Sequence, residues 1–157
     1  MTFQVRRVVT GHDKKGKAIV LSDETLTEPV TFRPGMDSYI AWSTNRLPAD
    51  NSIDQPSKVT ATTVEGGSVF RIIHYSPGVA PRDHRTESID YAVVLSGAID
   101  MELDDGVTVN LKAGEVLVQR GTIHNWVNHG PEDCVMAFVL IAAKPLQIGA
   151  QSLKAKG

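Results

Sequence analysis

A histidine and a carboxylate at regular spacing mark the first stretch of this chain that could do chemistry. Within GVAPRDHRTESIDYAVVLSG (78–97), His84, Thr86 and Asp90 fall at even intervals. In an extended strand, side chains at even intervals point to the same face. The spacing therefore predicts that an imidazole, a hydroxyl and a carboxylate lie together on one face.

A second stretch, GEVLVQRGTIHNWVN (114–128), supplies another imidazole. His124 follows a glycine turn and begins the alternating series His124, Trp126 and Asn128. If the two stretches pair in one β-structure, two histidines and one carboxylate can meet. That donor set is used for metal sites that keep open coordination positions.

The elements that must position these residues are strands. β-Branched and apolar runs separated by Gly and Pro turns, with almost no helical periodicity, predict an all-β sandwich or barrel. Residues 3–10 and 17–22 indicate an N-terminal hairpin. Residues 89–95 and 115–119 are expected to be buried on both faces, and the apolar run 134–142 is expected to be the central strand.

The segment IDMELDDGVTVNLK (99–112) predicts a hairpin with a defined register. A loop over 104–106, with Gly106 in the left-handed conformation, pairs Leu103 with Val107 and Met101 with Val109. A two-residue turn would instead mismatch the apolar faces. The acidic residues of this hairpin then form a solvated face and no catalytic cluster.

The two chemical stretches resemble the paired motifs of the cupin superfamily. The first family motif spaces a glycine, a His-x-His pair, a glutamate and a second glycine as Gly78, His84, Asp90 and Gly97 are spaced here. In this chain Thr86 takes the place of the second histidine, and aspartate replaces the glutamate.

The second motif also matches, with two differences. Gly114, Gly121, His124 and Asn128 fall at the family positions, but the turn is one residue shorter and Arg120 stands where proline is expected. Both motifs occur in the family's order.

The resemblance implies a jelly-roll (double-stranded β-helix) cupin barrel with an extended N-terminal β segment, often paired into homodimers, with the ligand pocket inside the barrel. It implies that His84, Asp90 and His124 are metal ligands for a divalent transition metal, namely Fe, Mn, Zn or Ni. A neutral hydroxyl is a poor donor, so the Thr86 position would stay open to water or substrate.

One domain is expected over residues 1–157. It comprises N-terminal strands and an irregular segment over 1–60, the core barrel with both motifs over 68–142, and a C-terminal tail over 143–157.

Thr86, His74, Gln119 and Trp126 are further candidates for the pocket wall. Parity in the strand 68–76 puts His74 on the face opposite Arg71, so at most one of them can face a cavity. Gln119 and Trp126 could contact a substrate, although such residues in barrels also serve as core or ladder residues.

Asp90 needs a partner, because its same-face neighbours along the strand are apolar. A metal cation would pair with it, and an arginine such as Arg120 would serve equally. Cys134 lies in an apolar run and is expected to be a buried, unreactive thiol.

Two functional classes follow from these patterns. The first is a metalloenzyme of oxygenase, decarboxylase, lyase or isomerase type that acts on a small organic molecule. The second is a metal-free cupin that binds or senses a small molecule. Metal content would separate them.

Composition and charge argue against nucleic acid and membranes as partners. The net charge of −2, with lysine and arginine scattered along the chain, gives no basic stripe for nucleic acid. No apolar run approaches the length of a membrane span, and no signal-peptide pattern opens the chain. We therefore expect a cytoplasmic protein, most simply a homodimer, whose partner is a small-molecule ligand or substrate.

Overall fold

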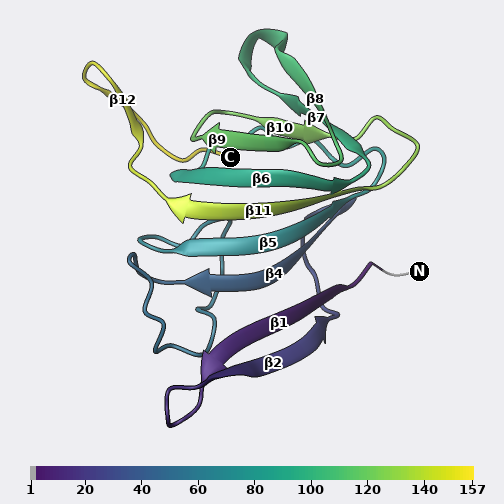
Figure 1. Cartoon of the computed structure of the whole chain (residues 1–157). Coiled ribbons are helices and arrows are strands. Elements are labelled where there is room, and N and C mark those ends of the chain that lie inside the picture. Colours follow the sequence, from purple (N-terminus) through teal and green to yellow (C-terminus); the bar gives the residue numbers. More distant parts are fainter. Residues whose placement is uncertain (1–2) are drawn as a thin grey trace.

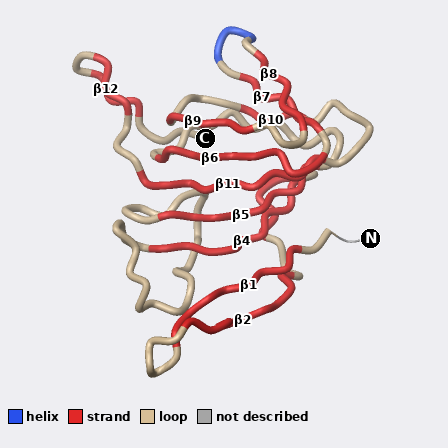
Figure 2. Tube along the Cα trace, viewed as in Figure 1, coloured by secondary structure: helices blue, strands red, loops and turns tan. Residues whose placement is uncertain are grey.

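The computed structural model describes residues 3–157, and its regular structure is almost entirely strand (Figures 1 and 2). The one helical element is a short 3-10 turn at Asp104–Gly106. The strands are β1 (Val5–His12), β2 (Ala18–Leu26), β3 (Val30–Arg33), β4 (Met36–Thr44), β5 (Ser68–Tyr75), β6 (Ser88–Ser96), β7 (Ala98–Glu102), β8 (Thr108–Lys112), β9 (Val116–Arg120), β10 (Asn125–Val127), β11 (Cys134–Ala142), β12 (Leu146–Ile148) and β13 (Gln151–Leu153).

Two sheets enclose the core. The larger has the order β3-β4-β5-β11-β6-β9, and the smaller has the order β10-β7-β8. All pairings are antiparallel, and the apolar run of β11 lies between β5 and β6, as its composition predicts. Figure 1 shows β4, β5, β11 and β6 stacked in that order, with the β7–β8 hairpin beyond them. The predicted jelly-roll barrel is confirmed.

Inward-facing side chains from both sheets meet between the layers. Met136 of β11, Ile99 of β7 and Val94 of β6 are each at most 1% exposed. Trp126 of β10 packs edge-on against Phe138 of β11, with ring centroids 5.6 Å apart. This contact ties the small sheet to the centre of the large one.

The β7–β8 hairpin has the register predicted from its sequence. Met101 pairs with Val109, and the Leu103 amide donates to the Val107 carbonyl at 2.7 Å. Gly106 has φ +74°, as expected, and Asp105 also adopts a left-handed conformation, with φ 57°. Aspartate tolerates this region better than most residues do.

The N-terminal hairpin is also confirmed, as β1 paired with β2 over a longer range than predicted. In Figure 1 it lies beside β4 at the purple end of the chain, away from β6 and β9. The C-terminal tail forms a second small hairpin, β12–β13.

The prediction that 89–95 and 115–119 are buried on both faces is wrong for the single chain. Tyr91 and Leu95 of β6 are about half exposed, at 49% and 52%, and Val116 of β9 is 72% exposed. One face of these strands meets the core, and the other forms an apolar outer face of the large sheet. Continuous apolar sequence cannot distinguish a face covered by the same chain from one that is left open.

None of residues 3–157 lies in a helix that is long and apolar enough to cross a membrane.

Candidate functional site

The two motif histidines meet, as predicted. An isolated antiparallel bridge joins the loop before β6 to the turn before β10, with reciprocal backbone hydrogen bonds of 3.0 and 2.9 Å between His84 and His124. The bridge brings the imidazole rings to a centroid distance of 4.2 Å. Both residues are buried, His84 at 8% and His124 at 4% exposure.

Backbone carbonyls orient the two rings. Nδ1 of His84 lies 3.1 Å from the Arg82 carbonyl, and Nδ1 of His124 lies 3.0 Å from the Thr122 carbonyl. A carbonyl can only accept a hydrogen bond, so each Nδ1 must be the protonated nitrogen. Nε2 of each neutral ring is then an unprotonated acceptor.

Burial keeps both rings neutral. Desolvation, together with repulsion from the adjacent His124 ring, lowers the pKa of His84 to about 4. Desolvation also lowers the pKa of His124, with added repulsion from Arg82 and Arg33. At neutral pH, the pair therefore presents two uncharged bases.

Asp90 lies on the wall of the same cavity, in a polar cluster on β6 and the loop before it. The Ser88 hydroxyl donates to the Asp90 carboxylate and lies 2.8 Å from the Thr86 hydroxyl. Burial raises the pKa of Asp90 to about 6, although the Ser88 hydrogen bond and the positive charge of Arg71 oppose that shift. The charged partner of Asp90 is thus Arg71, whereas Arg120 is exposed and does not line this cavity.

The three predicted metal ligands do not form a metal site in this arrangement. Among residues 3–157, no three His, Cys, Asp or Glu side chains are close enough together to hold one ion. His84 and His124 offer two Nε2 donors, but the shorter Asp90, in place of the family's glutamate, hydrogen-bonds to Ser88. Metal binding by these residues stays a prediction.

The other sequence candidates divide into two groups. Thr86 and Trp126 line the cavity with the histidines. His74 does not: it stacks on Phe3 and pairs with Asp133 at 2.9 Å, so its proposed role in the pocket is not supported. Gln119 is buried beside the cavity wall and hydrogen-bonds to Thr122.

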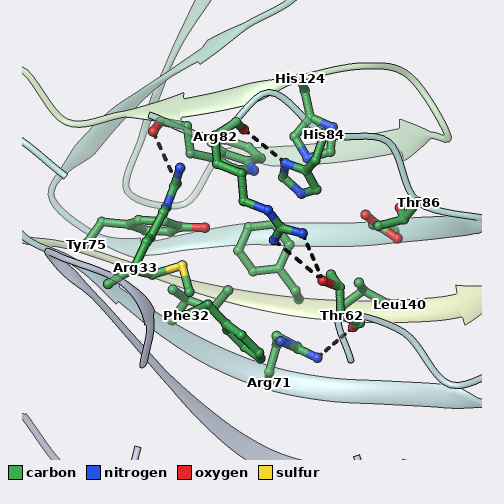
Figure 3. Close-up of a pocket in the computed structure, with 15 residues that line it drawn as sticks. Phe32, Arg33, Thr62, Arg71, Tyr75, Arg82, His84, Thr86, His124 and Leu140 are labelled. Carbon is green, nitrogen blue, oxygen red and sulfur yellow. Dashed lines mark hydrogen bonds between the residues drawn. The ribbon is translucent and has the colours of Figure 1, made fainter. Parts of the chain in front are cut away.

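Sequence reasoning missed the arginines of the cavity. Arg33 at the end of β3, Arg71 on β5 and Arg82 in the loop before His84 all line it (Figure 3). The parity argument did anticipate that only one of Arg71 and His74 faces inward, and Arg71 is that residue. An arginine inside the otherwise apolar run VFRII was the available signal.

Aromatic side chains complete the wall. Tyr75, Trp126 and Phe138 are buried, and Phe32 lies at the rim. The empty volume inside the cavity, counting solvent at its mouth, is about 510 Å³. Cys134, by contrast, is fully buried outside the cavity lining, and desolvation raises the pKa of its thiol to about 11, as expected of an unreactive cysteine.

Comparison with known proteins supports one family. Residues 71–141 match the family model described as the cupin domain. The chain is 38% identical to the phomopsin biosynthesis cluster protein C' of Diaporthe leptostromiformis, over 94% of this chain and 83% of that protein. It is 32% identical to the cupin-domain-containing oxidoreductase fogC of Aspergillus ruber, over 96% and 79% of the two chains.

A solved structure supports the fold. An uncharacterised conserved protein with a double-stranded β-helix domain from Klebsiella pneumoniae superposes with a TM-score of 0.52 at 22% identity. The match covers 75% of this chain and 84% of that one.

Proposed function

The chain belongs to the cupin family, and on that premise we propose that it is an enzyme of the cupin-domain oxidoreductase type that converts a small organic molecule inside its barrel. The names of its relatives support this proposal: one carries the oxidoreductase name and another belongs to a biosynthesis cluster. The observation that carries it is the buried pair of His84 and His124, whose Nε2 atoms are both unprotonated.

The polar residues of the cavity have different roles in orienting the substrate and in proton transfer. Neutral Nε2 atoms of His84 and His124 accept hydrogen bonds and can orient a substrate hydroxyl. Asp90, with a pKa of about 6, titrates closer to neutral pH than His84, whose pKa is about 4, and is the better matched general base of the two. Ser88 fixes the orientation of that carboxylate. An oxidation also requires a two-electron acceptor as co-reactant, for which dissolved dioxygen would serve: removal of two hydrogens from the substrate would reduce the dioxygen to hydrogen peroxide.

That Fe, Mn, Zn or Ni binds at His84, Asp90 and His124 remains a proposal. No step above depends on a metal. Among residues 3–157, no further His, Cys, Asp or Glu side chain lies close enough to the two imidazoles to share an ion with them. A second candidate function is compatible with that arrangement, in which the barrel binds or senses a small molecule without converting it.

Turnover separates the two functions. Purified protein is incubated with metabolite extracts from its source organism, and the extracts are compared by mass spectrometry with those treated with His124→Gln. The enzyme proposal expects a compound that is consumed only by the wild type, with a product that differs by two hydrogens or one oxygen. A compound that is retained by the protein but recovered unchanged supports the binding function.

Homodimer formation and a cytoplasmic location remain proposals. The apolar outer face over β6 and β9, with Tyr91, Val116 and Val118 each at least about half exposed, is the surface that a second copy would cover.

A further inference from the structure

We propose that the molecule bound in this barrel is an organic anion whose charged oxygens bind to the guanidinium groups of Arg33, Arg71 and Arg82. This inference deepens the proposed function, on which it rests for the role of the site, by giving the chemical class of the substrate. The three arginines come from separate parts of the chain and converge on one cavity beside His84 and His124 (Figure 3).

Arg71 is the most deeply buried of the three, at 2% exposure. Its Nη2 donates to the Thr62 carbonyl at 2.6 Å, and its Nε is buried without a partner. Its guanidinium carbon also lies 5.7 Å from the centre of the Phe32 ring. These contacts orient the guanidinium but leave its charge without an anion in contact.

Arg33 has still fewer partners. Its Nη2 makes one long contact, 3.4 Å, with the Trp126 carbonyl, and both Nε and Nη1 are buried without any partner. Buried donors without partners destabilise a protein, and a buried charge without a counterion does so more strongly. A ligand carboxylate would accept hydrogen bonds from such donors.

Arg82 has one short contact and two long ones. Its Nη2 donates to a main-chain oxygen of Gly157, the last residue of the printed sequence, at 3.0 Å, and its Nη atoms lie 3.4 and 3.5 Å from the Thr62 hydroxyl. The Thr62 hydroxyl is a neutral acceptor. Within residues 3–157, the acidic side chains that lie at ion-pair distance from a basic group contact Arg6, Arg7 and His74, and none of them contacts these three arginines.

The surroundings do not balance the charge. Asp90 is the single acidic residue on the described wall of the cavity, and it attracts Arg71 without forming an ion pair with it. The two imidazoles are neutral. Repulsion from Arg82 lowers the pKa of both Arg33 and Arg71, in addition to the effect of burial. The cavity therefore holds an excess of positive charge that an anion would neutralise.

The remaining wall indicates the rest of the ligand. Phe32, Trp126 and Phe138 add apolar aromatic surface to the cavity wall, with Phe32 beside Arg71. An inorganic anion would leave that surface unused, whereas a carboxylate or ionised phenol attached to an apolar body would contact both the arginines and the aromatic rings. Arg82 and the His84 ring are adjacent through the Arg82 carbonyl, so the anionic end would bind close to the reactive pair.

Benzoate and its neutral isostere benzamide test the proposal by isothermal titration calorimetry. Charge-assisted hydrogen bonds to guanidinium groups should make benzoate bind at least about tenfold more tightly than benzamide. Arg33→Gln and Arg82→Gln should each remove most of that preference. Arg46→Gln, which changes an exposed arginine outside the cavity, should retain it. Circular dichroism spectra and melting temperatures confirm that each variant is folded.

Three outcomes would overturn the inference. The first is equal affinity for benzoate and benzamide, and the second is a preference for benzoate that survives in both Arg33→Gln and Arg82→Gln. The third is failure of benzoate, acetate and succinate to bind at about 10 mM, the weak end of measurable affinity. The anion site and the enzyme proposal can be refuted independently. Turnover of a neutral compound would refute the anion site alone, whereas anion binding without any turnover would refute the enzyme proposal alone.

Discussion

Asp90 and His84 should give the stability of this protein two opposing pH dependences, and removing either residue should expose the other. Both groups are buried, at 4% and 8% exposure. Neither group contributes to the pKa shift of the other, so their effects on the free energy of unfolding can be treated as separate.

His84 stabilises the folded protein at higher pH. Its pKa falls from the ordinary 6.5 to about 4 on folding. Between these values the unfolded chain binds a proton that the folded chain does not, so stability is lost as the pH falls from 6.5 towards 4. At about 1.4 kcal/mol per pKa unit, the effect is about 3 kcal/mol. The pKa of His124 is lowered as well, so His124 acts in the same direction.

Asp90 has the opposite effect. Its pKa rises from the ordinary 3.8 to about 6, so between these values the folded chain binds the extra proton. The stability that this proton contributes is present at low pH and is lost as the pH rises towards 6. This effect is also about 3 kcal/mol by the same conversion, so the two largely cancel in the wild type.

The assay is urea unfolding of chelator-treated protein at a series of pH values from about 4 to 7, with each variant compared to the wild type at the same pH. Relative to the wild type, Asp90→Asn should gain up to about 3 kcal/mol as the pH rises, and His84→Gln should lose up to about 3 kcal/mol. His12→Gln, at an exposed histidine outside the cavity, is the control and should show a constant difference. If both pocket variants changed in the same direction, the reasoning would be refuted.

Four other results are expected. Gly97→Ala should destabilise the protein by about 3 kcal/mol in urea unfolding, because the added Cβ would lie 2.4 Å from the Asp133 carbonyl oxygen at φ +74°. Gly16→Ala, at a similar φ with open space around it, should cost only about 1 kcal/mol in the same assay. Thr86→His should raise Zn(II) affinity at least about tenfold by calorimetry, because it adds a third imidazole beside the pair; no gain would show that position 86 does not point at the two Nε2 atoms. Cys134 should react with a thiol reagent only upon unfolding, since it is fully buried; rapid reaction of the folded protein would contradict its placement. Val116→Lys with Val118→Lys should convert a homodimer to monomers in light scattering, and a monomeric wild type would refute the dimer proposal.

The sequence predicted the parts of the fold that depend on local patterns. The register of the β7–β8 hairpin followed from matching apolar faces across a three-residue loop. The central place of β11 followed from its unbroken apolar run. The meeting of His84 and His124 was implied by the motif resemblance, and the backbone bridge between them accounts for it.

Contacts between distant segments were harder to predict. Arg33 reaches the cavity from β3, within the range 1–60 for which the sequence predicted only strands and an irregular segment. Arg71 was expected to be at most an alternative to His74, because parity gives two faces without saying which one is inward. Motif spacing put Asp90 at the position of the family's glutamate, but it could not predict that the Asp90 carboxylate accepts a hydrogen bond from Ser88. The role of Asp90 as a metal ligand stays a prediction.

The central claim is that the buried His84–His124 pair orients the substrate of an enzyme. The most direct test is the rate at which wild-type protein, His84→Gln and His124→Gln consume a compound identified in the extracts. The account predicts that each single substitution lowers the rate at least about a hundredfold, as expected for loss of a group that acts on the transition state. Rates that match the wild type in both variants would contradict the claim and place the chemistry elsewhere.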